Sequence, residues 1–328
     1  MLQLSPEKLW SIPEKDLLQT LEASALSKTS TIHFYAPSFT YYKTKYFCSE
    51  SKSFPTISIT GTSCALNCGH CGGKVLETMH QAKSPDDLFD LCLKLKLEGA
   101  RGCLISGGCL PNGSVPFGSF LDSLGRVKRE LGLTVFVHSG VTGPQMANSF
   151  RKAGVDAALI DVLGSEETIR NVLNLKVTLH DYSKSLKSLE ASGLNVVPHV
   201  IVGLNKGKLD GELEALKMIS QIRPSALVII AFMPIRGTAM EKTPPPKPID
   251  IARVVATARL MFPKTPIVLG CMRPKGKARG ITDILALKAG ADAIAFPSEQ
   301  AVRYAENQGC KTIFSSFCCA QIYADLLP

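Results

Sequence analysis

The sequence predicts a single α/β domain, a (β/α)8 TIM-type barrel with an N-terminal helical cap and a C-terminal tail that carries cysteines. Three observations support this fold class. The 328 residues are 45% hydrophobic, so the chain can bury one large core. Short β-branched runs alternate with amphipathic stretches along most of the sequence. Alternation at these lengths requires right-handed crossovers between parallel strands, and eight such units close most simply into a barrel.

The N-terminal part is expected to lie outside the barrel. Residues 5–9 and 13–27 predict short helices, and residues 31–47 form an aromatic and polar lead-in. We therefore assign residues 1–50 to the cap and lead-in. Residues 51–328 are assigned to the barrel with its C-terminal extension.

The barrel strands are predicted from eight β-branched runs. They are residues 57–60, 102–105, 134–137, 157–160, 195–202, 227–232, 267–269 and 293–295. The amphipathic helices expected between them are residues 85–98, 117–131, 143–153, 165–173, 183–192, 211–222, 250–261 and 282–289. An open doubly wound sheet is the alternative, but no glycine-rich dinucleotide-binding motif follows the first strand.

The composition favours a soluble cytoplasmic protein without a membrane segment. No run of eighteen apolar residues occurs, and the first twenty residues lack a hydrophobic signal sequence. Eleven cysteines are too sparse for a disulfide-stapled miniprotein, so they indicate metal binding or core packing in a reducing compartment. The formal charge of +9 is dispersed and no basic run alternates with aromatic residues, so we expect no nucleic-acid binding. It is compatible with an acidic partner or a carboxylate ligand.

Three cysteines directly after the first predicted strand carry the clearest chemistry. Cys64, Cys68 and Cys71 follow a C-x3-C-x2-C spacing within one glycine-rich loop. Such thiolates can bind three irons of a 4Fe-4S cluster and leave the fourth iron open. An open iron can chelate the amino and carboxylate groups of S-adenosylmethionine (SAM) and deliver an electron to its sulfonium. A structural zinc site would need four ligands, and no second C-x2-C pair lies nearby.

This motif resembles that of the radical SAM superfamily, whose members usually carry an aromatic residue next to the adenine at the position of His70. The segment after the second strand resembles the superfamily's Gly-Gly-Glu motif, which receives the SAM amino group. Here Cys109 replaces the acid. The resemblance therefore implies SAM contacts from His70 and from the backbone of Ser106, Gly107 and Gly108.

The resemblance also suggests residues at later strand ends. Ser139 and Asp161 end the third and fourth strands, where similar enzymes contact the ribose or methionine of SAM. His199 in the fifth strand is either a substrate contact or a core histidine. Arg236 lies in a segment that resembles the superfamily's Pro-x-x-Gly-Thr loop, and a guanidinium there could bind a substrate carboxylate.

The remaining cysteines suggest a second iron-sulfur cluster. Cys48, Cys271, Cys318 and Cys319 could converge at the barrel mouth, and scattered apolar thiols are the alternative. The segment 270–274 and the terminal cysteine pair resemble the biotin synthase-like branch, in particular a component of the two-component, archaeal-type lipoyl synthase. In enzymes of this kind a second 4Fe-4S cluster can be consumed as the sulfur donor.

The resemblance implies a sulfurtransferase that inserts sulfur at an unactivated C-H bond of an octanoyl chain. The partners would be an octanoylated lipoyl-carrier protein or peptide, a second radical SAM protein for the other insertion, and a reductant such as ferredoxin. Two alternatives remain open: a mutase, lyase or maturase without sulfur insertion, and a non-catalytic iron-sulfur carrier. Iron content separates one cluster from two, at about four or about eight irons per chain.

Overall fold

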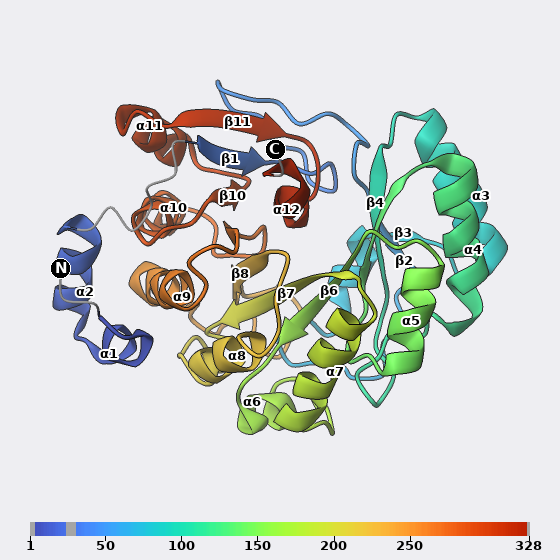
Figure 1. Cartoon of the computed structure of the whole chain (residues 1–328), viewed down its shortest axis with the longest axis horizontal. Helices are drawn as coiled ribbons and strands as arrows, with labels where there is room; N and C mark the ends of the chain where they lie inside the picture. Colours follow the sequence, from blue (N-terminus) through green and yellow to red (C-terminus); the bar gives the residue numbers. More distant parts are fainter. Residues whose placement is uncertain (1–3, 24–30, 327–328) are drawn as a thin grey trace.

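The computed structural model describes residues 4–23 and 31–326, and the strands among them form one parallel sheet. The eleven strands follow the order β11-β1-β10-β9-β8-β7-β6-β5-β4-β2-β3. They are β1 (Thr31–Tyr35), β2 (Thr56–Ser58), β3 (His80–Gln81), β4 (Gly102–Ser106), β5 (Thr134–His138), β6 (Ala157–Val162), β7 (Asn195–Val202), β8 (Leu227–Ala231), β9 (Ile267–Leu269), β10 (Ala293–Ala295) and β11 (Lys311–Ser315). Figure 1 shows them curving into an incomplete ring with helices outside. The chain is therefore an α/β protein built on a parallel half-barrel.

The eight predicted strands are present as β2 and β4 to β10. The closed eight-stranded barrel is not confirmed, because no pairing joins β3 to β11 at the two ends of the described sheet. Side-chain contacts tie β11 to the chain that leads into β2. Ser53 Oγ donates to the Ser316 carbonyl at 2.7 Å, and Glu50 N donates to Ser316 Oγ at 2.9 Å. The ring is thus held at its seam by loop contacts instead of a strand ladder.

Strand β1 comes from the segment expected as a lead-in. It pairs in parallel with β10 on one side and with β11 on the other. Ile32 and Phe34 pack into the core beneath the helices, whereas Tyr35 faces the interior of the half-barrel. A parallel strand buried on both faces shows no simple alternation of polar and apolar residues. Residues 31–35 therefore belong to the sheet.

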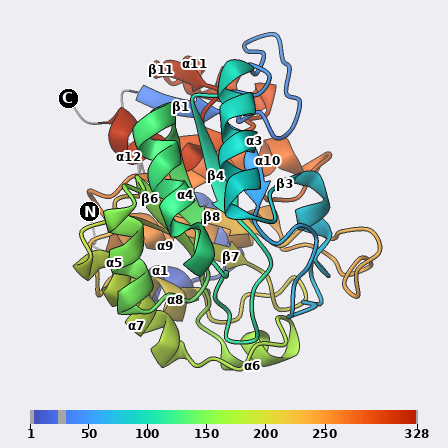
Figure 2. The ribbon, with the colours of Figure 1, turned by 90° about the vertical axis from the view of Figure 1, so that its right-hand side faces the viewer.

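Helices cover the outer face of the sheet. They are α1 (Pro6–Ser11), α2 (Glu14–Ala23), α3 (Pro85–Leu97), α4 (Leu121–Arg126), α5 (Pro144–Lys152), α6 (Glu166–Asn171), α7 (Leu179–Ala191), α8 (Glu212–Ile219), α9 (Pro248–Met261), α10 (Ala278–Lys288) and α11 (Glu299–Asn307). The last helix, α12 (Ile322–Asp325), lies on the inner side. Figure 2 shows α3, α4 and α5 beside one another on the outer face. Among the described helices, none combines the length and hydrophobicity needed to cross a membrane.

The N-terminal helices form a further layer outside the ring (Figure 1). Arg253 on α9 binds the C-terminal end of α1, because its Nη1 donates to the carbonyls of Leu9, Trp10 and Ile12 at 3.2, 2.8 and 2.8 Å. Helices α1 and α2 thus pack against the outer helix α9, and a cap over the barrel mouth is not confirmed. The predicted helix at 13–27 is present up to Ala23, and its remaining part lies outside the described residues.

The cysteine-bearing tail enters the interior of the half-barrel. Figure 1 shows α12 inside the ring of strands. Tyr35 Oη on β1 donates to Asp325 at 2.6 Å, and Tyr323 Oη donates to the carbonyl of Asp156, just before β6, at 3.3 Å. Since these contacts reach opposite sides of the ring, the tail forms part of the inner core.

Candidate active site

A cavity of about 280 Å³ lies at the carboxyl ends of β4 to β7. Cys64, Cys68 and Cys71 all line it. Parallel strands deliver their carboxyl-terminal residues to one edge, so side chains from distant parts of the chain meet there. Most of the remaining wall is apolar, with Leu66 and Ile201 among its residues. The three thiols therefore face a cavity whose wall is mainly apolar.

Backbone hydrogen bonds hold the cysteine loop from three directions. Ala65 N donates to the carbonyl of Cys109 after β4 at 2.9 Å, and Gly69 N donates to the carbonyl of Val172 after α6 at 2.7 Å. Met240 N, in the loop after β8, donates to the carbonyl of Gly69 at 3.1 Å. Three neighbouring loops thus fix the positions of the thiols.

The thiols fit the chemistry of an iron-sulfur cluster. Ligand atoms of Cys68, His70 and Cys71 lie within 4.8 Å of one another. A hydrogen bond between the thiols of Cys68 and Cys71 raises the pKa of Cys68 and lowers the pKa of Cys71, and His70 lowers the latter further. The pKa of Cys109 is raised to about 12, first by burial and then by repulsion from Cys64. The C-x3-C-x2-C loop thus presents three candidate ligands, as a cluster with one open iron requires.

The end of β4 lies directly against the cysteine loop. Ser106, Gly107 and Gly108 all line the cavity. A Cβ at Gly108 would lie 2.0 Å from the carbonyl oxygen of Ser63 and 2.6 Å from the Cα of Cys64. Only glycine allows this approach, which leaves the backbone of the segment exposed to a ligand in the cavity.

Ser139 and Arg236 lie outside the cavity wall, as does His199. Ser139 is 2% exposed, and its hydroxyl donates to the carbonyl of Gly140 at 2.9 Å. Arg236 is exposed in the loop after β8. Within that loop, Gly237 N donates to Glu241 at 2.6 Å. Neither predicted side chain is among those that line the cavity.

A polar group lies across β5, β6 and β7, with one residue from each strand. Ligand atoms of His138, Asp161 and His199 lie within 4.8 Å of one another, and His138 Nε2 is 3.5 Å from Asp161 Oδ1. His138 and Asp161 also line the cavity. All three side chains point inward because they occupy positions of the same parity as the interior residues Phe136, Leu159 and Val197.

The three groups shift one another's pKa values. Burial would raise the pKa of Asp161, but the neighbouring His138 outweighs it and holds the pKa near 2. Burial would lower the pKa of His138, yet the attraction of Asp161 raises it. Burial and then repulsion from His138 lower the pKa of His199 to about 4. The group therefore favours a carboxylate at Asp161 and a neutral imidazole at His199.

Three of the remaining predicted cysteines share the interior core. Cys319 is 5% exposed, and Cys271 and Cys318 pack against the same residues. A hydrogen bond between adjacent thiols lowers the pKa of Cys318 and raises that of Cys319. Burial and then Cys318 raise the pKa of Cys271 to about 11. Cys48 is exposed, and its thiol lies 3.9 Å from the carbonyl of Ser49.

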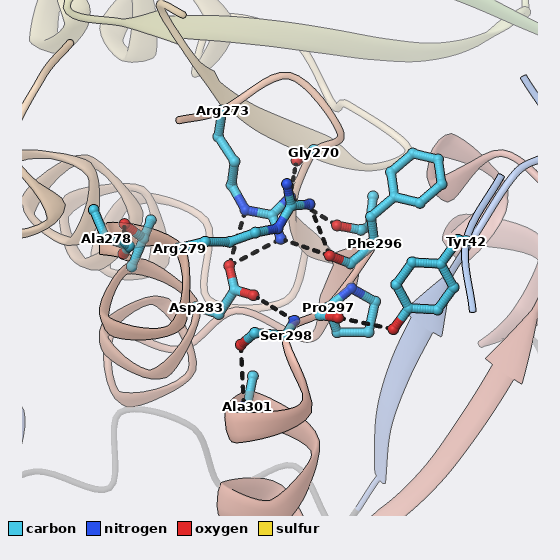
Figure 3. Close-up of polar contacts among 12 residues, drawn as sticks. Tyr42, Gly270, Arg273, Ala278, Arg279, Asp283, Phe296, Pro297, Ser298 and Ala301 are labelled. Atoms are coloured by element: carbon cyan, nitrogen blue, oxygen red, sulfur yellow. Dashed lines mark hydrogen bonds and ion pairs between the residues drawn. The ribbon is translucent and has the colours of Figure 1, made fainter. Parts of the chain in front are cut away.

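A buried arginine fixes the turn that carries Cys271 (Figure 3). Arg273 is fully buried, and its Nη1 donates to the carbonyls of Gly270 and Ala295 at 2.6 and 2.7 Å. Its Nε donates to Asp283 at 2.9 Å, and Ser298 N donates to the other oxygen of that carboxylate at 2.8 Å. The network joins the ends of β9 and β10 to α10.

Sequence reasoning did not assign a role to His138 or Arg273. His138 is a polar residue at a predicted strand end with inward parity, which could have signalled a site residue. Arg273 is visible only as part of a loop sequence, and its burial follows from packing between β9, β10 and α10.

Comparisons with known proteins agree with this arrangement. Residues 58–219 match the family model described as the radical SAM superfamily. Residues 229–314 match the Biotin and Thiamin Synthesis associated domain. The two matches together span the strands that build the cavity and most of those that follow.

Relatives and solved structures extend the likeness. The chain is 27% identical to a biotin synthase of Prochlorococcus marinus (strain MIT 9515) over 249 residues, covering 74% of this chain and 73% of the relative. The biotin synthase of strain MIT 9215 is 26% identical over 250 residues, covering 74% and 73%. Methylornithine synthase superposes with a TM-score of 0.64 at 17% identity, over 99% of this chain and 97% of that one. A maturase of the [FeFe]-hydrogenase gives 0.63 at 16% identity, over 98% and 74%.

Proposed function

Because the chain belongs to the radical SAM superfamily, we propose that it is an enzyme that inserts sulfur into an unactivated C-H bond. The proposed substrate is an octanoyl chain on a lipoyl-carrier protein or peptide. The observation that carries the proposal is that a second group of cysteines, Cys271, Cys318 and Cys319, packs inside the same half-barrel as the cysteine loop. Biotin synthase-like relatives support sulfur insertion as the reaction type.

Members of this superfamily bind a 4Fe-4S cluster and SAM. Cys64, Cys68 and Cys71 would hold the cluster in this chain. When bound, the cluster supplies the electron that cleaves SAM to methionine and a 5′-deoxyadenosyl radical. The exposed backbone of residues 106–108 would bind the amino group of SAM, and His70 would lie near the adenine. Both lie on the cavity wall beside the thiols.

The cavity wall is suited to protecting a reactive substrate. Leu66, Leu163, Leu173 and Ile201 contribute apolar surface next to the thiols. Such a wall excludes water and gives an alkyl chain a favourable environment. An octanoyl chain has no charged group along its length, so it fits this lining better than a polar metabolite would.

A second cluster is the proposed source of sulfur. Biotin synthase homologues carry a second cluster. In this chain Cys271, Cys318 and Cys319 would hold it, because they share one buried core. Cys48 was the fourth candidate, and its exposure makes it the weakest. The proposed partners are the octanoylated carrier, a second radical SAM protein for the other insertion, and a reductant such as ferredoxin. The net charge of +9 would favour an acidic carrier.

The alternative enzyme is a mutase, lyase or maturase that uses one cluster. The superpositions on methylornithine synthase and on the hydrogenase maturase show a shared fold and do not separate the reactions. The specific observation in its favour is that, among the described residues, only three cysteines pack in this interior core, one fewer than the ligands of a fully protein-bound cubane. A non-catalytic cluster carrier is a further alternative.

The experiment compares three proteins after anaerobic reconstitution with iron and sulfide. They are the natural chain, the double variant Cys271→Ser/Cys318→Ser, and the control Cys48→Ser. Each is incubated with SAM, a reductant and an octanoylated carrier peptide. Iron per chain, 5′-deoxyadenosine and the mass of the peptide are then measured.

We expect about eight irons in the natural chain and the control, and about four in the double variant, at one 4Fe-4S cluster per cysteine group. All three proteins should release 5′-deoxyadenosine, but only the natural chain and the Cys48→Ser control should add sulfur to the peptide. Four irons and an unchanged peptide in the natural chain, with 5′-deoxyadenosine released, would instead favour the one-cluster enzyme. Absence of 5′-deoxyadenosine would favour the non-catalytic iron-sulfur carrier.

A further inference from the structure

The polar group of His138, Asp161 and His199 has the geometry of a ligand set. One residue comes from each of three consecutive strands: His138 ends β5, Asp161 is the penultimate residue of β6, and His199 lies beside Asp161 within β7. Their ligand atoms all lie within 4.8 Å of one another, and His138 and Asp161 also face the cavity. Residues on adjacent strands of a sheet keep their spacing rigidly, so the three side chains form a preorganised cluster.

The backbone fixes the tautomer of His199. Its Nδ1 lies 3.1 Å from the carbonyl oxygen of Val197, and His199 is 9% exposed. A carbonyl oxygen can only accept a hydrogen bond, so the proton must be on Nδ1 and Nε2 must carry the free lone pair. An imidazole held in this way by a backbone carbonyl is the usual arrangement of a metal-binding histidine.

Asp161 and His138 do not form a close ion pair. The Oδ1 of Asp161 is shielded from solvent and has no hydrogen-bond partner among the described residues. It lies 3.5 Å from His138 Nε2, whereas charge-assisted hydrogen bonds of this type measure about 2.7–2.9 Å. The rings of His138 and His199 are tilted by 53° with centroids 5.4 Å apart, so they converge instead of stacking. The Asp161 carboxylate therefore lacks a close partner, and a small cation bound among the three side chains would supply one.

We propose that His138, Asp161 and His199 bind one divalent transition-metal ion of the Zn²⁺ or Fe²⁺ class. Two imidazoles and one carboxylate are a common ligand set for these ions, and they leave coordination positions open. Here His138 and Asp161 line the cavity, so an ion bound to them would be accessible from it. Mg²⁺ and Ca²⁺ prefer sites made of oxygen ligands, so they fit this group poorly.

The proposed ligands include no cysteine, and the proposal does not depend on sulfur insertion. It gives Asp161 and His199 a different role from the SAM and substrate contacts predicted from the sequence. A metal ion at this position would anchor an anionic or sulfur-containing group of the substrate inside the cavity.

The test uses protein with fully reconstituted iron-sulfur clusters, freed of loose metal on a chelating resin. Zn²⁺ is titrated by calorimetry into the natural chain, Asp161→Asn, His199→Gln and the control His180→Gln, which changes an exposed histidine on α7. X-ray absorption at the zinc edge then identifies the ligands. Zinc bound by nitrogen and oxygen shows distances of about 2.0–2.2 Å, and zinc bound by cysteine shows about 2.3 Å.

We expect one Zn²⁺ per chain with only nitrogen and oxygen ligands and with scattering from imidazole rings. Asp161→Asn and His199→Gln should each lower the affinity about tenfold or more, and His180→Gln should leave it unchanged. The iron content of each variant reports whether it has folded. If Asp161→Asn or His199→Gln loses iron, the zinc affinity of the other variant tests the proposal.

Three results would overturn the proposal. One is the absence of a zinc equivalent beyond the clusters. The second is sulfur among the zinc ligands. The third is a loss of SAM affinity in Asp161→Asn without a loss of zinc affinity, which would return Asp161 to the predicted contact with SAM.

Discussion

Replacement of Arg273 by methionine should be among the most destabilising single changes in the chain. Arg273 and Asp283 are both fully buried as an ion pair. Arg273→Met would leave the carboxylate with the backbone donor Ser298 N but without its cation, and would leave the carbonyls of Gly270 and Ala295 without this donor. Removing one partner of a buried pair costs about 3–5 kcal/mol, and the attraction of the nearby Arg279 for Asp283 places the expected loss at the lower end of this range.

A double-mutant cycle measured by urea unfolding tests this reasoning. The variants are Arg273→Met, Asp283→Leu and the two together. Since the double variant leaves no unpaired charge, it should lose about 1–3 kcal/mol less than the sum of the single losses. The control is Arg126→Met, which breaks a solvent-exposed pair with Glu130 and should lower stability far less than Arg273→Met.

Two outcomes would refute the argument. One is a loss below about 1 kcal/mol for Arg273→Met, well under the cost of breaking a buried ion pair. The other is strict additivity in the cycle, since it would mean that Arg273 and Asp283 do not stabilise each other.

Three further variants test other parts of the structure. Gly108→Ala should lower iron incorporation, because the added Cβ would collide with the cysteine loop, whereas Gly118→Ala meets no atom within 4 Å and should not. Burial raises the pKa of Glu212 from 4.5 to about 7, so its contribution to stability is full below pH 4.5 and falls as pH rises through 7. Glu212→Gln should therefore remove about 3 kcal/mol of pH dependence, measured by urea unfolding at pH 4.5 and pH 8. Tyr35→Phe removes the hydrogen bond to Asp325 and should cost about 1–2 kcal/mol and speed proteolysis of the tail.

Each of these expectations has a clear counter-result. Equal iron content in Gly108→Ala and Gly118→Ala would mean that the β4 end does not constrain the cysteine loop. An unchanged pH profile in Glu212→Gln would assign the pH dependence to other groups. Equal cleavage of the tail in Tyr35→Phe and the natural chain would show that this hydrogen bond does not hold α12 inside the ring.

Most strands could be predicted because burial leaves a local mark on the sequence. The strands β5, β6 and β7 are buried on both faces, so each appears as a run of β-branched and apolar residues. The segment 31–35 carries a weaker mark, because it mixes aromatic and polar residues. Its neighbours in the sheet, β10 and β11, lie more than 250 residues later in the chain. Nothing local indicates such a distant pairing.

The cysteine loop differs in kind from the other candidate residues. Cys64, Cys68 and Cys71 are close in sequence, so the covalent chain alone keeps their thiols near one another. Cys271 and Cys318 are separated by a long stretch of the chain, and the packing of the tail inside the ring brings them into one core. Residue type alone does not identify a member of this group. Cys48 is also a cysteine, but it is exposed and lies outside the shared core.

Spacing within the chain therefore determines the three-thiol loop and the succession of strands and helices, since both are set by short-range geometry. The seam between β11 and β2, the tail inside the ring and the meeting of His138, Asp161 and His199 depend on strand register and tilt. Register is chosen by the free energy of packing the whole sheet at once, so no short segment encodes it.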